Sequence, residues 1–391
     1  MVRQYNLLLP RQVVFGWGRR AELPELAAAP CRRVFLVRGS RTLDALGLID
    51  EIAGGLRTSG VEVVDLTTVS REPLVEDVDD VQAQLLSHRV SPEDGVIAVG
   101  GGAAIDLGKA AAALATNQHG DSVQDFLEGV GRGFTLKQHP LPFIAVPTTA
   151  GTGSEATKNA VISSTDPQFK KSLRSDWMMP QTVVIDPELT VSAPPTVTAH
   201  SGMDALTQLI ESYVSCRAQP VTRALCIEGL QAGLPAVEEA YRNGNSRPAR
   251  EAMAHAAFLS GVALANSGLG IAHGVAAALG VHCNAPHGLA CAVMLPVALK
   301  LNRSWIMHDL ARLARLTLQL EIASDEEAAR CFIERIEQIC RHVGIPDRLS
   351  EIGATAGQIP DIVRSSHGNS RRGNPREISD DELAQVLEES L

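Results

Sequence analysis

The sequence predicts an α/β N-terminal domain followed by an all-α C-terminal domain. The chain has 391 residues, more than one ordinary domain core requires, so two domains are expected. Hydrophobic residues make up 45% of it and aromatic residues only 4%, which is typical of an α/β enzyme built on Ala, Val, Leu and Ile. Short β-branched runs alternate with helical stretches in the first half, and this alternation stops near residue 187.

Short apolar runs closed by Gly, Pro or Thr predict the strands of the first domain, which we assign to residues 1–187. The runs are RRVFLVRG, VEVVDLTT, DGVIAVGGG and PFIAVPTT. Between them, residues 43–58, 76–89 and 103–116 carry apolar positions at helical spacing, and further short strands are expected within 160–186. Alternation of this kind implies parallel strands with helices on the faces of the sheet.

The second domain, residues 188–391, is expected to contain only helices. Its Ala- and Leu-rich stretches are interrupted at Pro220, residues 243–248, Pro286, Pro346 and the basic loop RSSHGNSRRGNP. Ser379 and Glu382 have the spacing of a capping box, which predicts the start of the last helix.

Charge and cysteine content restrict the partners of the chain. A net charge of −10 argues against nucleic acid or an anionic membrane. The seven cysteines show no zinc-finger spacing, which suits a reducing compartment. The start, MVRQYNLLLPRQ, lacks the pattern of a signal peptide, and apolar runs such as IAHGVAAALGV are too short to span a bilayer. We therefore expect a cytoplasmic protein that binds neither membrane nor nucleic acid.

Three consecutive glycines predict a phosphate-binding loop. Gly100, Gly101 and Gly102 follow a predicted strand and open the helix AAIDLGKAAAALA. Glycine lets the backbone approach a ligand closely, and a helix N-terminus offers N–H groups and positive potential to a pyrophosphate. A tight turn without a ligand is the alternative, because the spacing is not GxGxxG.

A second polar cluster, PTTAGTGSE at residues 147–155, also follows an apolar strand. Hydroxyl groups that can bond phosphate, ribose or the nicotinamide amide belong to Thr148, Thr149, Thr152 and Ser154. The alternative is a turn whose hydroxyls bond its own backbone.

Polar residues of the second half have the character of metal ligands. Asp204 and Gln208 are four residues apart and share one face of a predicted helix. The segment GLGIAHGVAAALGVHCNAPHG adds His273, His282 and His287. Carboxylate, amide oxygen and imidazole together suit Fe²⁺ or Zn²⁺. Structural roles, such as helix capping or a core histidine, are equally compatible with the spacing.

Several long motifs occur in one order along the chain. They are VVFGWGRRAEL, GGGAAIDLGKA, PTTAGTGSEAT, VVIDPELT, SGMDALTQLIESYVS, NSGLGIAHGVAAALG and APHG. With these motifs the chain resembles the iron-containing (group III) alcohol dehydrogenase family over nearly its whole length. The resemblance implies a dehydroquinate synthase-like fold with an N-terminal dinucleotide-binding domain. It also implies NAD(P), a divalent metal (Fe²⁺ or Zn²⁺) and a homodimer.

By this resemblance, Gly100, Gly101 and Gly102 hold the cofactor pyrophosphate. Asp106 and Lys109 belong to the same motif. Positions that contact the nucleotide and the nicotinamide are matched by Thr148, Thr149 and Thr152. Three of the four metal ligands of the family are matched by Asp204, His273 and His287.

The chain departs from the family at two metal-site positions. Gln208 stands where the fourth ligand is usually histidine, and Ala277 stands where the family usually has a histidine linked to substrate or proton handling. A glutamine oxygen is a poorer donor than imidazole for Fe²⁺ or Zn²⁺. His200 lies four residues before Asp204, so in a continuous helix it would replace the missing imidazole, although a turn is expected there.

The choice between NAD and NADP also depends on one position. NAD-specific relatives often carry an aspartate after the second strand, where this chain has Gly39 between Arg38 and Arg41. An acidic side chain there would bond the ribose hydroxyls and repel a 2′-phosphate. Either cofactor therefore remains compatible with the sequence.

We expect hydride transfer between NAD(P) and a small alcohol, aldehyde or keto acid, with a divalent metal polarising the substrate oxygen. Without metal, His273 or His287 would bind that oxygen and relay its proton. The alternatives are a metal-independent NAD(P)H reductase of the maleylacetate type, which GNP at 373–375 also resembles, and a non-catalytic nucleotide-binding relative. Glycerol dehydrogenase and dehydroquinate synthase relatives would need a fuller set of histidines.

Overall fold

The computed structural model describes residues 4–391 as two compact units. An α/β unit contains residues 8–149 and 154–192. A helical unit contains residues 193–391, the short loop 150–153 and residues 4–7. The units are thus interleaved in sequence, and a single functional boundary at residue 187 stays a prediction.

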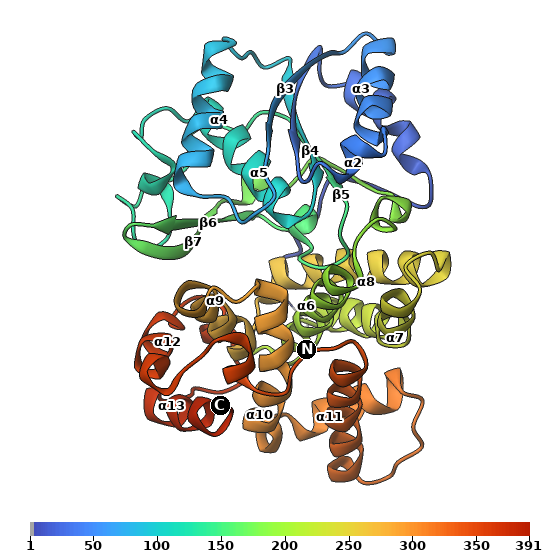
Figure 1. The fold of residues 1–391 in the computed structure, drawn as a ribbon, viewed down its shortest axis with the longest axis vertical. Helices are drawn as coiled ribbons and strands as arrows, with labels where there is room; N and C mark the ends of the chain where they lie inside the picture. Colours follow the sequence, from blue (N-terminus) through green and yellow to red (C-terminus); the bar gives the residue numbers. More distant parts are fainter. Residues whose placement is uncertain (1–3) are drawn as a thin grey trace. The chain divides into compact units, whose positions relative to one another are not determined.

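A six-stranded parallel sheet forms the centre of the α/β unit (Figure 1), in the order β1-β8-β5-β4-β2-β3. Its strands are β1 (Gln12–Phe15), β2 (Arg33–Arg38), β3 (Glu62–Thr68), β4 (Asp94–Gly100), β5 (Phe143–Pro147) and β8 (Thr182–Ile185). An antiparallel hairpin is formed by β6 (Asn159–Thr165) and β7 (Gln168–Arg174). The predicted α/β class is confirmed, but β1 was not predicted, because this edge strand has only four residues.

The helices of this unit are α1 (Leu23–Ala28), α2 (Thr42–Ala45), α3 (Leu48–Thr58), α4 (Val75–Ser87) and α5 (Gly102–Thr116). The helix predicted at 43–58 is divided into α2 and α3 around Gly47. Alternate residues of the buried strands serve two separate cores: Phe35 and Val37 pack with α4 and α5, whereas Val34 and Leu36 pack with α1 and α3. Because both faces of these strands are buried, their sequences are continuous apolar runs, and such runs predicted the strands.

Asp186, in the motif VVIDPELT, ties the end of β8 to the turn after β1. Its fully buried carboxylate accepts hydrogen bonds from Gly18 N at 2.9 Å and from Arg20 Nη1 at 2.8 Å. It also caps the short turn that follows by accepting from Glu188 N at 3.1 Å. The motif VVFGWGRRAEL supplies Gly18 and Arg20, so two of the motifs in the sequence meet in one structural contact.

The helical unit consists of α6 (Pro195–Val214), α7 (Pro220–Arg242), α8 (Arg247–Ser267), α9 (Ile271–Cys283), α10 (His287–Thr317), α11 (Asp325–His342), α12 (Ile359–Ser365) and α13 (Asp380–Glu389). Their apolar residues form one continuous core. The interruptions predicted from Pro220, residues 243–248 and Pro286 coincide with observed breaks.

Short 3₁₀ turns occur in both units. They are Arg19–Glu22, Val123–Phe126, Ser154–Ala156, Asp176–Met178, Pro187–Thr190, Leu349–Ile352, Ala356–Gln358 and Arg371–Gly373.

The predicted capping box of α13 is only half formed. Ser379 Oγ accepts from Glu382 N at 3.1 Å, as expected of an N-cap. The Glu382 carboxylate instead pairs with Arg376, at 2.5 Å. The predicted bond between the Glu382 carboxylate and the backbone N–H of Ser379 was wrong, because the guanidinium of Arg376 is the stronger partner for the carboxylate.

Within residues 4–391, one helix has the length and composition of a membrane span, contrary to the expectation that every apolar run is too short. This helix is α10, and a second such span would arise if α8 and α9, which meet at 101°, counted as one. However, α10 packs against α6, α9 and α11 (Figure 1). In addition, 56% of its apolar stretch is buried. Core helices of folded domains pass the same test, so its composition is explained by core packing.

The loop 150–153 belongs to the helical unit because its glycines pack against helices. Gly153 has φ +60°, and a β-carbon on it would lie 2.5 Å from Gly261 Cα on α8. A β-carbon on Gly151 would lie 2.5 Å from Ser201 Cβ on α6. Such distances exclude any side chain, so two glycines of PTTAGTGSE serve close helix packing.

Candidate functional site

The predicted phosphate loop lies where two neighbouring parallel strands end. Gly100 and Pro147 are paired at the carboxyl ends of β4 and β5, and Thr148 N donates to Gly100 O at 3.0 Å. The glycine loop and the first threonines of the second motif therefore form one edge. Ligands of open α/β sheets bind at the carboxyl ends of the strands.

The triple glycine permits close backbone contact at this edge. A β-carbon on Gly100 would lie 2.6 Å from Ala104 Cβ and 2.8 Å from Gly39 Cα. A β-carbon on Gly39 would lie 2.9 Å from Gly100 Cα, so close packing is a reason for glycine there besides the choice between NAD and NADP. A β-carbon on Gly101 would lie 3.2 Å from Thr149 Oγ1, so Thr149 adjoins the turn. Helix α5 begins here without a side-chain cap or an acidic residue in its first turn, as anion binding requires.

Asp106 and Lys109 are engaged within the protein. Lys109 Nζ lies 3.2 Å from Asp106 Oδ1 and donates to Ser154 O at 2.9 Å and to Thr157 Oγ1 at 3.0 Å. Asp106 Oδ2 accepts from Val161 N at 3.0 Å. Burial raises the pKa of Asp106 and lowers that of Lys109. This buried pair fixes the hairpin to α5, and a contact between Asp106 and the cofactor stays a prediction.

Thr152 and Gln208 contact each other inside the helical unit. Gln208 Nε2 donates to Thr152 O at 3.2 Å, and Gln208 Oε1 accepts from Ser260 Oγ at 2.8 Å. The backbone carbonyl of Thr152 accepts only, so it fixes the amide with nitrogen toward the loop and oxygen toward Ser260. The predicted nucleotide contact of Thr152 and the predicted metal contact of Gln208 both stay predictions.

Helix α6 carries a stripe of polar side chains through the core. Every residue from Gly202 to Val214 is buried, yet Asp204, Gln208 and Glu211 lie among them at helical spacing. Buried polar groups require partners, since leaving them unpaired costs a few kcal/mol, about 1–3 for each neutral group. The stripe therefore indicates a site rather than a packing surface.

Four potential metal ligands converge on this stripe. One ligand atom each from Asp204, His273, His287 and Cys291 lies within 4.8 Å of every other. The helices α6, α9 and α10 supply them, with His273 in the first turn of α9 and His287 at the start of α10. The structure thus brings together three predicted ligands, and it adds Cys291, which the sequence analysis missed.

His273 is held between two carboxylates. Its Nδ1 lies 2.6 Å from Glu211 Oε2, and its Nε2 lies 3.1 Å from Asp204 Oδ1. Glu211 also accepts from Ala272 N at 2.7 Å, at the N-terminus of α9. Donation of the Nδ1 proton to Glu211 leaves Nε2 directed at Asp204, which is the usual orientation of a metal-ligating histidine with a carboxylate behind it.

A metal ion bound to His273 would take the place of the proton on its Nε2. Burial alone would lower the pKa of His273. The adjacent Cys291 and the bonds to Asp204 and Glu211 outweigh burial and hold its pKa well above the ordinary value. Burial raises the pKa of Cys291 to about 12. Both groups must lose a proton to bind a metal, so metal affinity should fall as the pH falls.

The cluster fits a divalent ion by its spacing and by an unpaired atom. Donors around a tetrahedral ion at ~2.0–2.3 Å lie ~3.3–3.8 Å apart. His287 Nε2 and Cys291 Sγ are 3.7 Å apart, within this range, and Asp204 Oδ1 and His273 Nε2 are slightly closer, at 3.1 Å. Asp204 Oδ2 is buried without a hydrogen-bond partner. An unpaired buried carboxylate oxygen is unusual unless a bound ion or a water completes its bonding.

Two other histidines do not join the cluster. His200 is in α6, so the turn expected at this position was wrong. Although it is one helical turn from Asp204, it contributes no atom to the ligand group, and the proposed replacement of the missing imidazole is therefore not supported. His282 Nε2 bonds Ser365 Oγ at 2.7 Å on an exposed surface. Ala277 follows His273 by one turn and brings no polar group.

The residues missed in the sequence have a recognisable spacing. Cys291 follows His287 by four residues on α10, and Glu211 follows Asp204 by seven on α6. Both spacings place the pairs on one helical face. Zinc-finger spacing does not reveal the first pair, and the four-residue spacing of Asp204 and Gln208 does not reveal the second.

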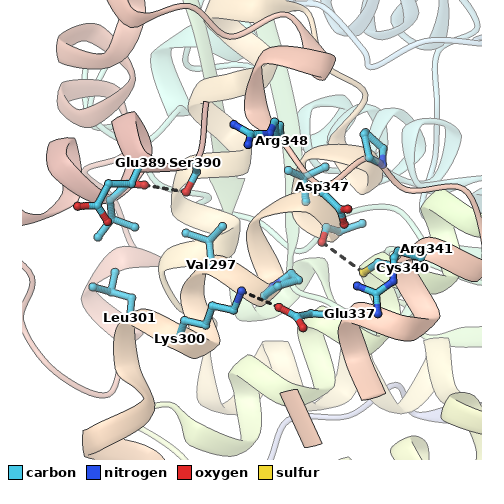
Figure 2. Close-up of a pocket in the computed structure, with 15 residues that line it drawn as sticks. Val297, Lys300, Leu301, Glu337, Cys340, Arg341, Asp347, Arg348, Glu389 and Ser390 are labelled. Atoms are coloured by element: carbon cyan, nitrogen blue, oxygen red, sulfur yellow. Dashed lines mark hydrogen bonds and ion pairs between the residues drawn. The ribbon is translucent and has the colours of Figure 1, made fainter. Parts of the chain in front are cut away.

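Pockets on the helical unit lie away from this cluster. One of about 700 Å³ is lined by α10, α11, the segment 346–348 and the end of α13, and Figure 2 shows its charged side chains. Lys300 there pairs with Glu337 at 2.6 Å. None of the four candidate ligands lines it. Its mixture of charges indicates no particular ligand.

Comparison with known proteins covers nearly the whole chain. The profile described as iron-containing alcohol dehydrogenase matches residues 10–187, and the profile for the C-terminal part of the Fe-containing alcohol dehydrogenase family matches residues 198–391. The chain belongs to the iron-containing alcohol dehydrogenase family. The resemblance found in the sequence is thereby confirmed, and the order of the two profiles agrees with the α/β and helical parts of the fold.

Individual members of the iron-containing alcohol dehydrogenase family are similar over their full lengths. Long-chain-alcohol dehydrogenase 1 from Geobacillus thermodenitrificans is 34% identical and covers 92% of this chain and 90% of its own. NADPH-dependent butanol dehydrogenase from Clostridium saccharobutylicum is 31% identical, and the match covers 97% of this chain and 96% of that protein. The solved structure of an alcohol dehydrogenase from Oenococcus oeni superposes with a TM-score of 0.90 at 31% identity, covering 99% of this chain and 100% of that one.

As a member of this dehydrogenase family, the chain is an NAD(P)-dependent oxidoreductase acting on alcohols and carbonyl compounds. The family uses iron or another divalent metal, and the cluster on α6, α9 and α10 is a possible site for it. The assignment of individual ligands and of individual cofactor contacts stays a prediction.

Replacing Glu211 by glutamine is expected to weaken metal binding by about 10- to 100-fold, the usual effect of losing the carboxylate behind a ligating histidine. Glutamine keeps the volume but loses the charge that fixes the Nδ1 proton of His273. Competition with a chromophoric chelator measures the affinity. Glu228→Gln is the matched control, since Glu228 pairs with His255 on the exposed surface. Equal zinc affinity in both variants and the wild type would contradict this role.

Proposed function

We propose that the chain is a metal-assisted dehydrogenase that interconverts a small alcohol and its carbonyl compound with NAD(P), and that Asp204, His273 and His287 hold the divalent ion. The observation that carries this proposal is the unpaired Oδ2 of Asp204 within a buried group of converging donors. A bound ion would polarise the substrate oxygen and stabilise the charge that develops on it during hydride transfer.

The side chains of the cluster have separate tasks in this proposal. Asp204 contributes a negative charge from the buried centre of α6. Glu211 holds the Nδ1 proton of His273 and so keeps its Nε2 available as a donor. Ala277 offers no acid–base group, so proton transfer to or from substrate has no side-chain partner at this position.

The alternative of a metal-independent NAD(P)H reductase is favoured by Gln208 and Ala277, the two departures from the family pattern. Here His273 or His287 would donate a proton to the carbonyl oxygen of a keto acid. The other alternative, a non-catalytic nucleotide-binding relative, is opposed by membership of a family whose similar members are dehydrogenases.

A cytoplasmic location and a homodimeric assembly belong to the same proposal. The net charge of −10 supports a protein that avoids anionic membranes and nucleic acid. The homodimer rests on the family resemblance alone.

We expect the protein to retain close to one equivalent of a divalent metal when it is purified without chelator, and to lose turnover of alcohols with NAD(P) on chelation. Zn²⁺ or Fe²⁺ added back should restore the rate. Mass spectrometry measures the metal content, and initial rates before and after chelation measure the turnover. A metal-free protein that still reduces carbonyl compounds with NAD(P)H would instead select the reductase.

A further inference from the structure

The cluster contains a donor that the ordinary ligand set of the family does not include. Cys291 Sγ lies 3.7 Å from His287 Nε2, one helical turn along α10, and the Cys291 side chain is completely buried. It lies within 4.8 Å of the ligand atoms of Asp204 and His273 as well. The thiol therefore lies beside three polar ligand atoms as well as in the apolar core.

The residue at the usual fourth-ligand position is engaged elsewhere. Gln208 donates to Thr152 O and accepts from Ser260 Oγ, so both ends of its amide hold the loop 150–153 and α8 against α6. A metal bond would use a second lone pair of an oxygen already oriented toward Ser260. The structure therefore gives Gln208 a tethering role and leaves the fourth position to another side chain.

A thiolate changes which ion the cluster prefers. Thiolate ligands favour Zn²⁺ over harder ions such as Mg²⁺, Ca²⁺ and Mn²⁺, and divalent sites in general bind Zn²⁺ more tightly than Fe²⁺. Coordination to a divalent ion deprotonates a thiol outright. One thiolate, two imidazoles and one carboxylate are all accepted ligands of tetrahedral zinc.

We propose that Cys291 is the fourth protein ligand of the divalent ion, in place of residue 208, and that this ligand set makes the chain a zinc protein. The proposal rests on the proposed metal-assisted function for the presence of an ion. It assigns new roles to Cys291 and Gln208, the first as a ligand and the second as a tether.

Cobalt is the probe that tests this assignment, because a thiolate bound to Co²⁺ gives a charge-transfer band in the near ultraviolet that nitrogen and oxygen ligands do not give. We expect the metal-free wild-type protein to develop this band with one equivalent of Co²⁺. Cys291→Ala should lose the band and bind zinc at least about 100-fold more weakly, exceeding the 10- to 100-fold effect of a partner behind a ligand.

Two variants serve as matched controls. Cys283→Ala removes a half-buried cysteine of α9 that lies outside the cluster, and it should keep the band and the zinc affinity. Gln208→Ala should keep the band, because residue 208 is a tether. Loss of zinc in Gln208→Ala, together with wild-type zinc affinity in Cys291→Ala, would overturn the proposal.

X-ray absorption at the zinc edge of the wild-type protein gives an answer that does not depend on folding of any variant. One sulfur neighbour at about 2.3 Å is expected, together with nitrogen and oxygen neighbours at about 2.0–2.2 Å. A shell of nitrogen and oxygen alone, or no bound metal, would overturn the proposal. A sulfur shell in a protein without turnover would leave the ligand assignment standing and remove the proposed function. Chelator-sensitive turnover without a sulfur shell would do the reverse.

Discussion

His287→Ala is expected to lose the bound metal and to lower kcat/KM for alcohol oxidation by ~10³-fold, because the ion supplies several kcal/mol of charge stabilisation in the transition state. His287 begins α10 and contributes its Nε2 beside Cys291. With an alanine at this position, the donors of α6 and α9 lose the imidazole that closes the cluster on the α10 side. Metal content and steady-state kinetics of the purified variant measure the two effects together.

The matched control is His282→Ala, five residues earlier in the chain. His282 bonds Ser365 on an exposed surface and contributes nothing to the ligand group, so metal content and kcat/KM should remain within about twofold of wild type. Retention of metal and of activity in His287→Ala would contradict the assignment. Loss of activity with the metal retained would instead favour His287 as the proton donor of the metal-independent reductase.

The fold was predictable from the sequence because its strands and helices have strong periodic signals. The runs that became β2, β4 and β5 are buried on both faces, and such strands read as continuous apolar segments. Edge strand β1 gave no such signal, since two of its four residues are exposed. The other edge strand, β3, was predicted from the run VEVVDLTT, so the short length and exposure of β1, rather than its place at an edge, explain why it was missed.

The candidate site was only partly predictable, because its chemistry depends on which helices meet. Asp204, His273 and His287 were predicted from motifs, but spacing within one helix cannot show that a thiol of α10 joins a carboxylate of α6. The same limit applies to Thr152, which its motif groups with Thr148 and which the fold places in the helical unit. Gln208 is a further example: its motif indicated a weak ligand but gave no sign of its contacts with Thr152 O and Ser260.

Gly100→Ala is expected to destabilise the α/β unit by about 2–3 kcal/mol and to weaken NAD(P)H binding at least about tenfold, since overpacking at a rigid site costs about this much. The added β-carbon would lie 2.8 Å from Gly39 Cα and 2.9 Å from Gly39 N. Backbone atoms cannot rotate away as a side chain can, so the ends of β2 and β4 must separate. That movement displaces Gly101 and the uncapped start of α5, where the pyrophosphate is predicted to bind.

Thermal unfolding and a fluorescence titration with NADH and NADPH measure the two effects of Gly100→Ala. Gly54→Ala is the matched control, because Gly54 lies within α3 and a β-carbon there meets no atom within 4 Å. This control should leave nucleotide affinity unchanged and raise stability by about 0.5–1 kcal/mol, the helix propensity of alanine over glycine. If Gly100→Ala bound NAD(P)H like the wild type, the glycine edge would serve only as a strand–helix turn, and the cofactor would have to contact another part of the α/β unit.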